Sequence, residues 1–188
     1  MAMSIIKKVR EEILVDEFVR VDKLWITAYG ETFDRILVKS KDAVCILVKN
    51  VDTNQFYFVN QLRACKYQDE DPTTIEAVAG MLELGEDIYD TARRECLEEV
   101  GFKVDELNYW GYTLSAPGIV TEKMHFFYTE VKNADKIEEG GGLDHENENI
   151  TVITFSEKEI FSRLKNGEWD DSKTVVLVQR YFLEKMGI

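Results

Sequence analysis

The sequence predicts an α/β (α+β) protein, and two patterns in its 188 residues carry that prediction. In one central segment, residues 87–100, apolar side chains recur at every fourth position, which is the spacing of an amphipathic helix. On both sides of this segment lie short apolar runs, some continuous and some alternating with polar residues, that end near Gly, Asp or Asn. Such runs predict the strands of a sheet.

The central helix is predicted with both of its ends. Asp87 stands where a side-chain oxygen caps the first turn, and Asp90 follows in that turn, where negative charge is favoured. Gly101 stands where a left-handed residue ends a helix. The apolar stripe of the helix consists of four residues: Ile88, Ala92, Cys96 and Val100.

The last turn of this helix is unusually acidic. Glu95, Glu98 and Glu99 lie three and four residues apart, so their carboxylates crowd one face at the negative end of the helix dipole. Arg94 precedes Glu98 by four residues and is expected to offset only one of these charges. A divalent cation would remove the whole penalty, and Mg²⁺ commonly joins one or two carboxylates to substrate phosphates. The alternative is an ordinary solvated acidic face, since charged side chains mostly stay exposed.

The rest of the chain shows further strands and helices. Residues 4–12 are charged and are expected to form a short helix or a frayed end. A turn at Tyr29-Gly30-Glu31 would join the first two strands into an early hairpin. Strands are predicted at residues 18–27, 32–38, 43–48, 56–62, 74–78, 106–114, 123–131 and 150–155, and helices at residues 156–165 and 173–185.

Three consecutive glycines occur at residues 140–142, inside an acidic loop. The sequence offers no folding benefit for them. We therefore expect them to provide mobility or a close approach to a substrate, as loops at functional sites do.

Composition limits the class of function. The net charge of −13 opposes binding to a nucleic-acid backbone, which requires clustered Lys and Arg. The sequence shows no signal peptide and no long apolar run, so neither export nor insertion in a membrane is expected. The three cysteines are odd in number and lack the spacing of metal ligands, which fits a reducing cytoplasm.

A fixed pattern of residues surrounds the helix. Gly80 is followed after five residues by Glu86, after seven more by Arg94-Glu95, and then by Glu98-Glu99 and Gly101. These identities make up the complete Nudix box. At a usage of roughly 7% per residue type, chance would produce them at about 10⁻⁸ per start position. The chain therefore resembles the Nudix hydrolases.

The resemblance implies a fold and a domain organisation. The fold would be a Nudix α/β/α sandwich with a mixed sheet and an N-terminal antiparallel hairpin or small sheet. Residues 1–42 would supply dimer-forming N-terminal strands, and residues 43–188 would form the hydrolase domain. Segment 115–127, the three glycines and Lys173-Thr174 are similar to the nucleoside-diphosphate-sugar pyrophosphatase group, including its GDP-mannose and ADP-ribose branches.

That group implies Mg²⁺-dependent hydrolysis, with Mn²⁺ as a substitute, of the pyrophosphate in a nucleoside diphosphate sugar. The products would be a nucleoside monophosphate and a sugar phosphate, and the enzyme would be a homodimer with exchanged N-terminal strands. Two alternatives stay open: hydrolysis of nucleoside triphosphates or dinucleotides, and a non-catalytic sensor of nucleotide sugars. The base and the sugar stay open as well. Asn60 stands where the group usually has a second arginine, and Phe33-Asp34-Arg35 replace a basic-acidic cluster.

The resemblance also implies roles for individual residues. Glu146 and Glu99 are expected to be catalytic, with Glu146 as the general base and Glu148 as the alternative base. The expected metal ligands are the backbone carbonyl of Ala79 and the carboxylates of Glu95, Glu98, Glu99 and Glu146. The expected substrate contacts are Phe18, Arg63, Gly80, Met81, Glu122, His145 and Lys173.

Overall fold

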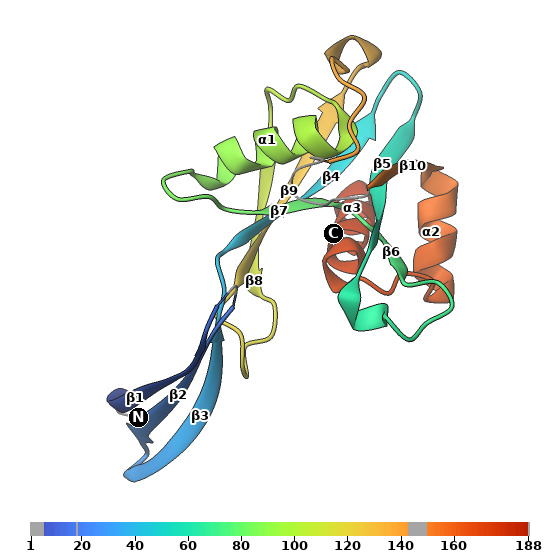
Figure 1. Ribbon diagram of the computed structural model, residues 1–188. Coiled ribbons are helices and arrows are strands. Elements are labelled where there is room, and N and C mark those ends of the chain that lie inside the picture. The colour runs from blue at the N-terminus through green and yellow to red at the C-terminus, as the bar shows by residue number, and fades with distance from the viewer. Residues whose placement is uncertain (1–5, 18, 143–149, 188) are drawn as a thin grey trace. The chain divides into compact units, whose positions relative to one another are not determined.

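The computed structural model describes residues 6–17, 19–142 and 150–187. The chain divides into two compact units, shown in Figure 1. The first comprises Met1–Asp42 with Thr113–Met124, and the second comprises Ala43–Tyr112 with His125–Ile188. In the described ranges, no helix combines the length and the apolar character needed to cross a lipid bilayer.

The first unit contains a three-stranded antiparallel sheet in the order β1-β2-β3. Its strands are β1 (Lys7–Asp16), β2 (Arg20–Ala28) and β3 (Glu31–Lys39). The predicted hairpin between β2 and β3 is confirmed. Tyr29 and Gly30, with φ of 55° and 83°, form its two-residue turn. Positive φ at both central residues is what a type I′ hairpin turn requires.

The expectation of a short helix or a frayed end at residues 4–12 is wrong, because β1 occupies this segment. The charged side chains of β1 find partners on the sheet itself. Glu11 accepts hydrogen bonds of 2.6 Å from Lys8 of the same strand and from Lys39 of β3. Lys39 also forms an ion pair with the fully buried Asp22 of β2. These charges therefore stabilise a strand that has no apolar period of its own.

The second unit is built on a seven-stranded sheet with the order β10-β5-β4-β9-β8, to which β6 adds beside β5 and β7 beside β4. The strands are β4 (Ala43–Asn50), β5 (Gln55–Leu62), β6 (Thr73–Glu76), β7 (Val78–Met81), β8 (Asn108–Leu114), β9 (Lys123–Val131) and β10 (Thr151–Ser156). The helices are α1 (Ile88–Val100), α2 (Glu157–Asn166) and α3 (Ser172–Met186), and short 3₁₀ turns lie at Ala64–Lys66 and Asn133–Asp135. The three predicted helices are confirmed to within one or two residues.

The core of the second unit lies on both faces of β4. Val44, Ile46 and Val48 pack with the apolar stripe of α1, including Ala92 and Cys96. Successive strand residues point to opposite faces. The intervening Cys45 and Leu47, also fully buried, therefore face the side on which α3 packs against β4 (Figure 1). Burial on two faces explains why this strand is a continuous apolar run in the sequence.

The strand predicted at residues 74–78 is divided into two in the structure. β6 pairs with β5 through Thr73–Glu76, and β7 then pairs with β4 through Val78–Met81. Ala77 lies between them, and its backbone N–H donates to Thr174 Oγ1 of α3 over 2.7 Å. The chain thus passes from one strand of the sheet to the next, and it reaches the Nudix-box glycine, Gly80, directly after this step.

Candidate active site

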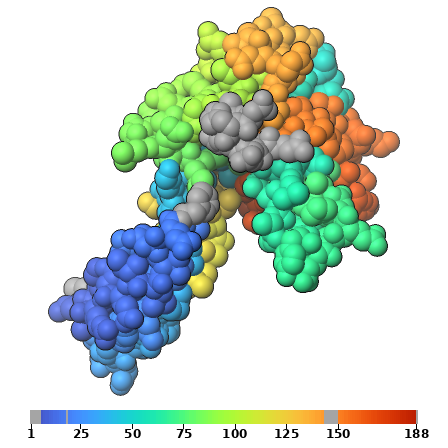
Figure 2. Space-filling model, viewed as in Figure 1, coloured from blue at the N-terminus to red at the C-terminus, as the bar shows by residue number. Residues whose placement is uncertain are grey.

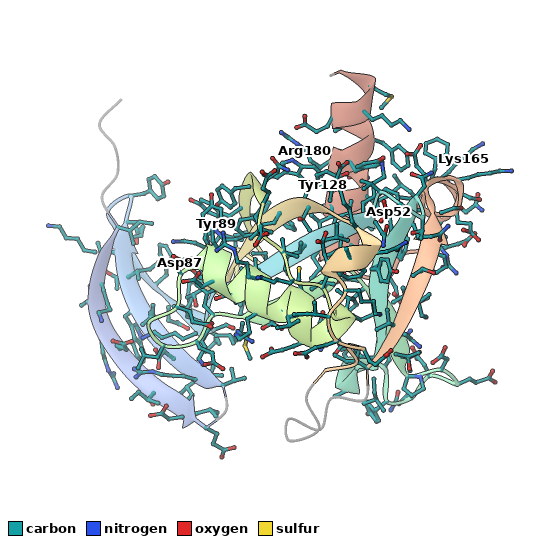
Figure 3. All side chains as sticks on the ribbon, turned by 90° about the horizontal axis from the view of Figure 1, so that it is seen from above. Asp52, Asp87, Tyr89, Tyr128, Lys165 and Arg180 are labelled. Atoms are coloured by element: carbon teal, nitrogen blue, oxygen red, sulfur yellow. The ribbon has the colours of Figure 1, made fainter. Side chains whose placement is uncertain are left out.

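The ends of α1 are held as the sequence predicts. Asp87 accepts hydrogen bonds from the backbone N–H groups of Tyr89 (2.7 Å) and Asp90 (2.9 Å). Figure 3 labels Asp87 and Tyr89 together at the start of the helix. Gly101, with φ of 77°, ends the helix and donates its N–H to Leu97. These caps fix the length of α1, and with it the position of the acidic last turn.

Arg94 contacts three carboxylates, which corrects the expectation that it offsets only one. Its Nε and Nη2 donate to Glu86 over 3.0 and 3.1 Å. Its Nη1 donates to Glu95 over 2.8 Å and to Glu98 over 2.9 Å. Nη2 also reaches the carbonyl of Met81 at 3.3 Å. Glu86 belongs to the box, but its contact with Arg94 was not predicted, because only folding of the 82–86 loop brings Glu86 to the helix.

The ion pairs around Arg94 set the charges of this cluster. The hydrogen bonds that Arg94 donates lower the pKa of Glu86 to about 2, although burial of Glu86 acts in the opposite direction. Burial likewise acts against the charge on Arg94, but the hydrogen bond to Glu86 and the charge of Glu95 outweigh it and raise the pKa of Arg94. Arg94 and Glu86 therefore form an ion pair at neutral pH.

Glu95 and Glu99 lie against the backbone of β7. Both are buried, with 8% and 2% of their surfaces exposed. The N–H of Ala79 donates to Glu99 Oε2 over 3.1 Å. At Gly80, a Cβ atom would lie 1.8 Å from Glu95 Oε1, so only glycine leaves room for that carboxylate. The structure therefore brings Ala79, Gly80, Glu95 and Glu99 together.

This donor set suits a hard divalent cation. Among the described residues, no group of three or more His, Cys, Asp or Glu side chains is arranged to hold a metal alone. Mg²⁺, however, usually takes only one or two carboxylates and completes its shell with water and substrate phosphates. Two adjacent buried carboxylates next to a backbone without a Cβ atom satisfy that requirement.

The three-glycine segment has a structural role that the sequence analysis did not find. Gly140, Gly141 and Gly142 all have positive φ, between 77° and 109°. The N–H groups of Gly141 and Gly142 donate to the carbonyls of Glu99 (2.9 Å) and Glu98 (3.0 Å). These carbonyls belong to the last turn of α1, where no partner is available within the helix. The glycines thus complete the end of the helix that carries the acidic residues.

A second cluster surrounds Glu76 at the end of β6. Arg63 donates to both oxygens of Glu76, from Nε and Nη2, over 2.6 Å each. Lys173 at the start of α3 donates to Glu76 as well and to Asp171 over 3.0 Å. Arg63 and Lys173 are predicted from the sequence, whereas Glu76 and Asp171 are not. A carboxylate within the otherwise apolar run Ile75 to Val78 was the available signal.

Comparison with known proteins adds the family. The family model of the NUDIX domain matches residues 39–178. This chain belongs to the Nudix family. That result confirms the resemblance carried by the box and the expectation of a Nudix hydrolase.

Curated relatives of this Nudix protein extend over most of its length. It is 29% identical over 174 residues to the GDP-mannose pyrophosphatase of Klebsiella pneumoniae subsp. pneumoniae, which covers 92% of this chain and 83% of the relative. It is 30% identical over 151 residues to the GDP-mannose pyrophosphatase of Cronobacter sakazakii, with coverages of 79% and 75%. These matches confirm the expected group within the family.

A solved structure resembles the fold of the Nudix protein. The crystal structure of an ADP compounds hydrolase superposes with a TM-score of 0.75 and covers 97% of this chain and 96% of its own. The sequence identity is 16%, so this likeness concerns the fold alone. It confirms the predicted α/β class with an N-terminal antiparallel sheet.

The remaining predicted residues of the Nudix site are distributed as follows. Met81 ends β7 and is 44% exposed. Glu122 belongs to the first unit, where its carbonyl accepts from the N–H of Ser115 over 3.2 Å. Phe18, His145 and both base candidates, Glu146 and Glu148, lie outside the described residues. The roles expected for all of these residues stay predictions.

Proposed function

We propose that this Nudix protein hydrolyses the pyrophosphate of a nucleoside diphosphate sugar, with GDP-mannose as the first candidate and ADP-ribose as the second. The products would be a nucleoside monophosphate and a sugar phosphate. The observation that carries the proposal is the similarity to GDP-mannose pyrophosphatases over 92% of the chain. The geometry of the box supports it, because the buried Glu95 lies against Gly80 and the buried Glu99 accepts from the N–H of Ala79.

The proposed cofactor is Mg²⁺, with Mn²⁺ as a substitute. Glu95, Glu99 and the carbonyl of Ala79 would hold it, with Glu98 beside them and Glu146 from the following loop. When bound, the cation would neutralise the phosphate charge and lower the pKa of the attacking water. Arg94 orients the carboxylates of Glu95 and Glu98 through its Nη1.

The remaining chemistry falls to side chains of the chain itself. Glu146 is proposed to take the proton of the attacking water, as a general base must lie within hydrogen-bonding reach of that proton. Arg63 is proposed to bind the diphosphate, because a guanidinium matches phosphate oxygens with paired donors. Its side chain is 41% exposed and therefore accessible to a ligand.

We further propose a cytoplasmic homodimer in which residues 1–42 form the exchanged strands and residues 43–188 the hydrolase domain. The support is in β1 and the residue before it, where several large apolar side chains are exposed to solvent. They are Ile6 (65%), Val9 (63%), Ile13 (50%), Leu14 (47%) and Val15 (43%). Exposed apolar residues gathered on one strand mark an interaction surface.

A substrate panel tests the proposed function. The protein is incubated with Mg²⁺ and GDP-mannose, ADP-ribose, UDP-glucose, ADP-glucose or a nucleoside triphosphate. Release of sugar phosphate or phosphate is followed with a coupled phosphatase assay. We expect cleavage of GDP-mannose well above the others. Preference for a nucleoside triphosphate would overturn the substrate class, and tight binding of a nucleotide sugar without turnover would favour the sensor.

A further inference from the structure

One buried carboxylate is shared by two cations of the proposed substrate site. Glu76 is only 2% exposed, and its two oxygens accept from Arg63 and Lys173. Lys173 is 8% exposed and also donates to Asp171, the N-cap of α3. Two carboxylates thus balance two cations in a cluster that joins β5, β6 and α3.

The contact with Glu76 determines which edge of Arg63 a ligand can reach. Glu76 occupies the edge formed by Nε and Nη2, with both distances at 2.6 Å. Among the described residues, Nη1 donates to no side chain or carbonyl, and the side chain is 41% exposed. A guanidinium is a rigid plane with five N–H donors. Once one edge is fixed, the other edge presents Nη1 and the second N–H of Nη2 in a set direction.

The backbone of Arg63 is fixed as well. Its N–H donates to the carbonyl of Pro72 over 2.9 Å, which closes the 64–71 loop. That loop contributes to the exposed surface of the second unit (green in Figure 2). The hydrogen bond that Arg63 donates to Glu76 outweighs burial and raises the pKa of Arg63, and the charges of Glu76 and Glu99 act in the same direction. Arg63 is thus held through its backbone as well as through the edge of its side chain that contacts Glu76.

Lys173 is less suited to contact a substrate directly. Two of its three N–H donors are used by Glu76 and Asp171, and little of its surface is exposed. Burial acts against its charge, but the charges of Asp171 and Glu76 outweigh burial and raise its pKa. It therefore stays charged and holds one oxygen of Glu76 in place.

We propose that Glu76 is a positioning residue, which, held by Lys173, fixes the Nε–Nη2 edge of Arg63 so that the Nη1–Nη2 edge binds a phosphate of the substrate. This proposal rests on the proposed function, because it names Arg63 as the phosphate ligand. Glu76 itself touches no substrate and acts only through Arg63.

A double-mutant cycle tests this role. Glu76→Gln keeps the shape of the side chain but removes its charge and one acceptor for Arg63. We expect KM for GDP-mannose to rise about tenfold and kcat to change less than threefold, as for loss of a contact present equally in ground and transition states. Arg63→Ala should raise KM at least as much. The double variant should be no worse than Arg63→Ala, because Glu76 has nothing left to position.

Controls separate positioning from stability. Glu157→Gln removes a carboxylate that pairs with Lys185 and Tyr181 on α3, and it should leave KM unchanged. If Glu76→Gln does not fold, Arg63→Lys replaces it, since lysine retains the charge but cannot offer two edges. Its KM should also rise about tenfold. An unchanged KM in Glu76→Gln would overturn the proposal. Where Arg63→Lys is used because Glu76→Gln does not fold, an unchanged KM in Arg63→Lys would overturn it as well. So would a double variant in which the KM increases of the two single variants multiply.

A binding measurement distinguishes failure of this proposal from failure of the proposed function. Inorganic pyrophosphate is titrated into wild-type and variant protein with Mg²⁺ in a calorimeter. We expect its Kd to rise about tenfold in Glu76→Gln. If the protein turned over no substrate of the panel but the tenfold difference in pyrophosphate Kd remained, the proposed function would be overturned and the positioning role would stand. Equal affinities, or no pyrophosphate binding by the wild type, would overturn the positioning role.

Discussion

Gly80 and Glu95 are packed so closely that a single carbon atom added to the glycine would lie 1.8 Å from Glu95 Oε1. The next atoms of the same carboxylate would lie at 2.0 and 2.6 Å. Real Cβ atoms do not come this close to another heavy atom, so the carboxylate must move if the residue changes. The glycine of the box is thus required by contact with the proposed metal ligand and not by its backbone angles.

The first prediction follows from this contact. Gly80→Ala should displace Glu95 and lower kcat/KM about a hundredfold or more, because misplacement of about 1 Å can have this effect. Steady-state kinetics with Mg²⁺ measures it. Gly118→Ala is the matched control, since a Cβ there meets no atom within 4 Å. Equal activity of Gly80→Ala and wild type would contradict the close packing.

The second prediction concerns the three glycines. Gly140→Ala would place a Cβ 2.6 Å from the carbonyl oxygen of Glu99, at a φ of +80°. We expect a loss of unfolding free energy of about 2–3 kcal/mol, the sum of backbone strain and the clash. Chemical denaturation measures it. Gly167 has a similar φ of +69°, but a Cβ there would meet no atom within 4 Å, so Gly167→Ala should lower the unfolding free energy by only about 1 kcal/mol. Equal losses in the two variants would show that contact with α1 is unimportant.

The third prediction concerns acid stability. Because Arg94 lowers the pKa of Glu86 from 4.5 to about 2, the unfolded chain binds more protons than the folded chain between these values. The stabilisation is therefore fully present above pH 4.5 and is lost as pH falls towards 2. Glu86→Gln should be less stable than wild type at pH 6, and the difference should shrink at pH 3. A constant difference across this range would contradict the ion pair.

The parts of the fold that the sequence predicts well are those set by local signals. α1 was predicted with both caps because Asp87, the four-residue stripe and Gly101 all act within one or two turns. β4 was predicted because burial on two faces leaves a continuous apolar run. β1 was missed because its charges are matched by Lys39 and other residues of the sheet, and no local pattern reveals such pairing.

The same distinction applies to the candidate site. The box located Glu95, Glu98 and Glu99 on one helix face, but it did not reveal that Arg94 also holds Glu86. The cluster at Glu76 depends on Lys173, which lies 97 residues further along the chain. Only the tertiary packing of α3 against the β6–β7 step brings these two residues together. Long-range pairing of this kind has no period or spacing in the sequence.

The most direct test of the account compares turnover of GDP-mannose by wild-type protein and Glu99→Gln in the presence of Mg²⁺. Glutamine keeps the shape of the side chain and an acceptor oxygen for the N–H of Ala79, so stability should change by less than about 1 kcal/mol. The loss of charge at the proposed metal site should lower kcat by about a hundredfold or more. Glu184→Gln, an exposed carboxylate on α3, serves as the control. A folded Glu99→Gln protein with wild-type turnover would contradict the assignment of the active site.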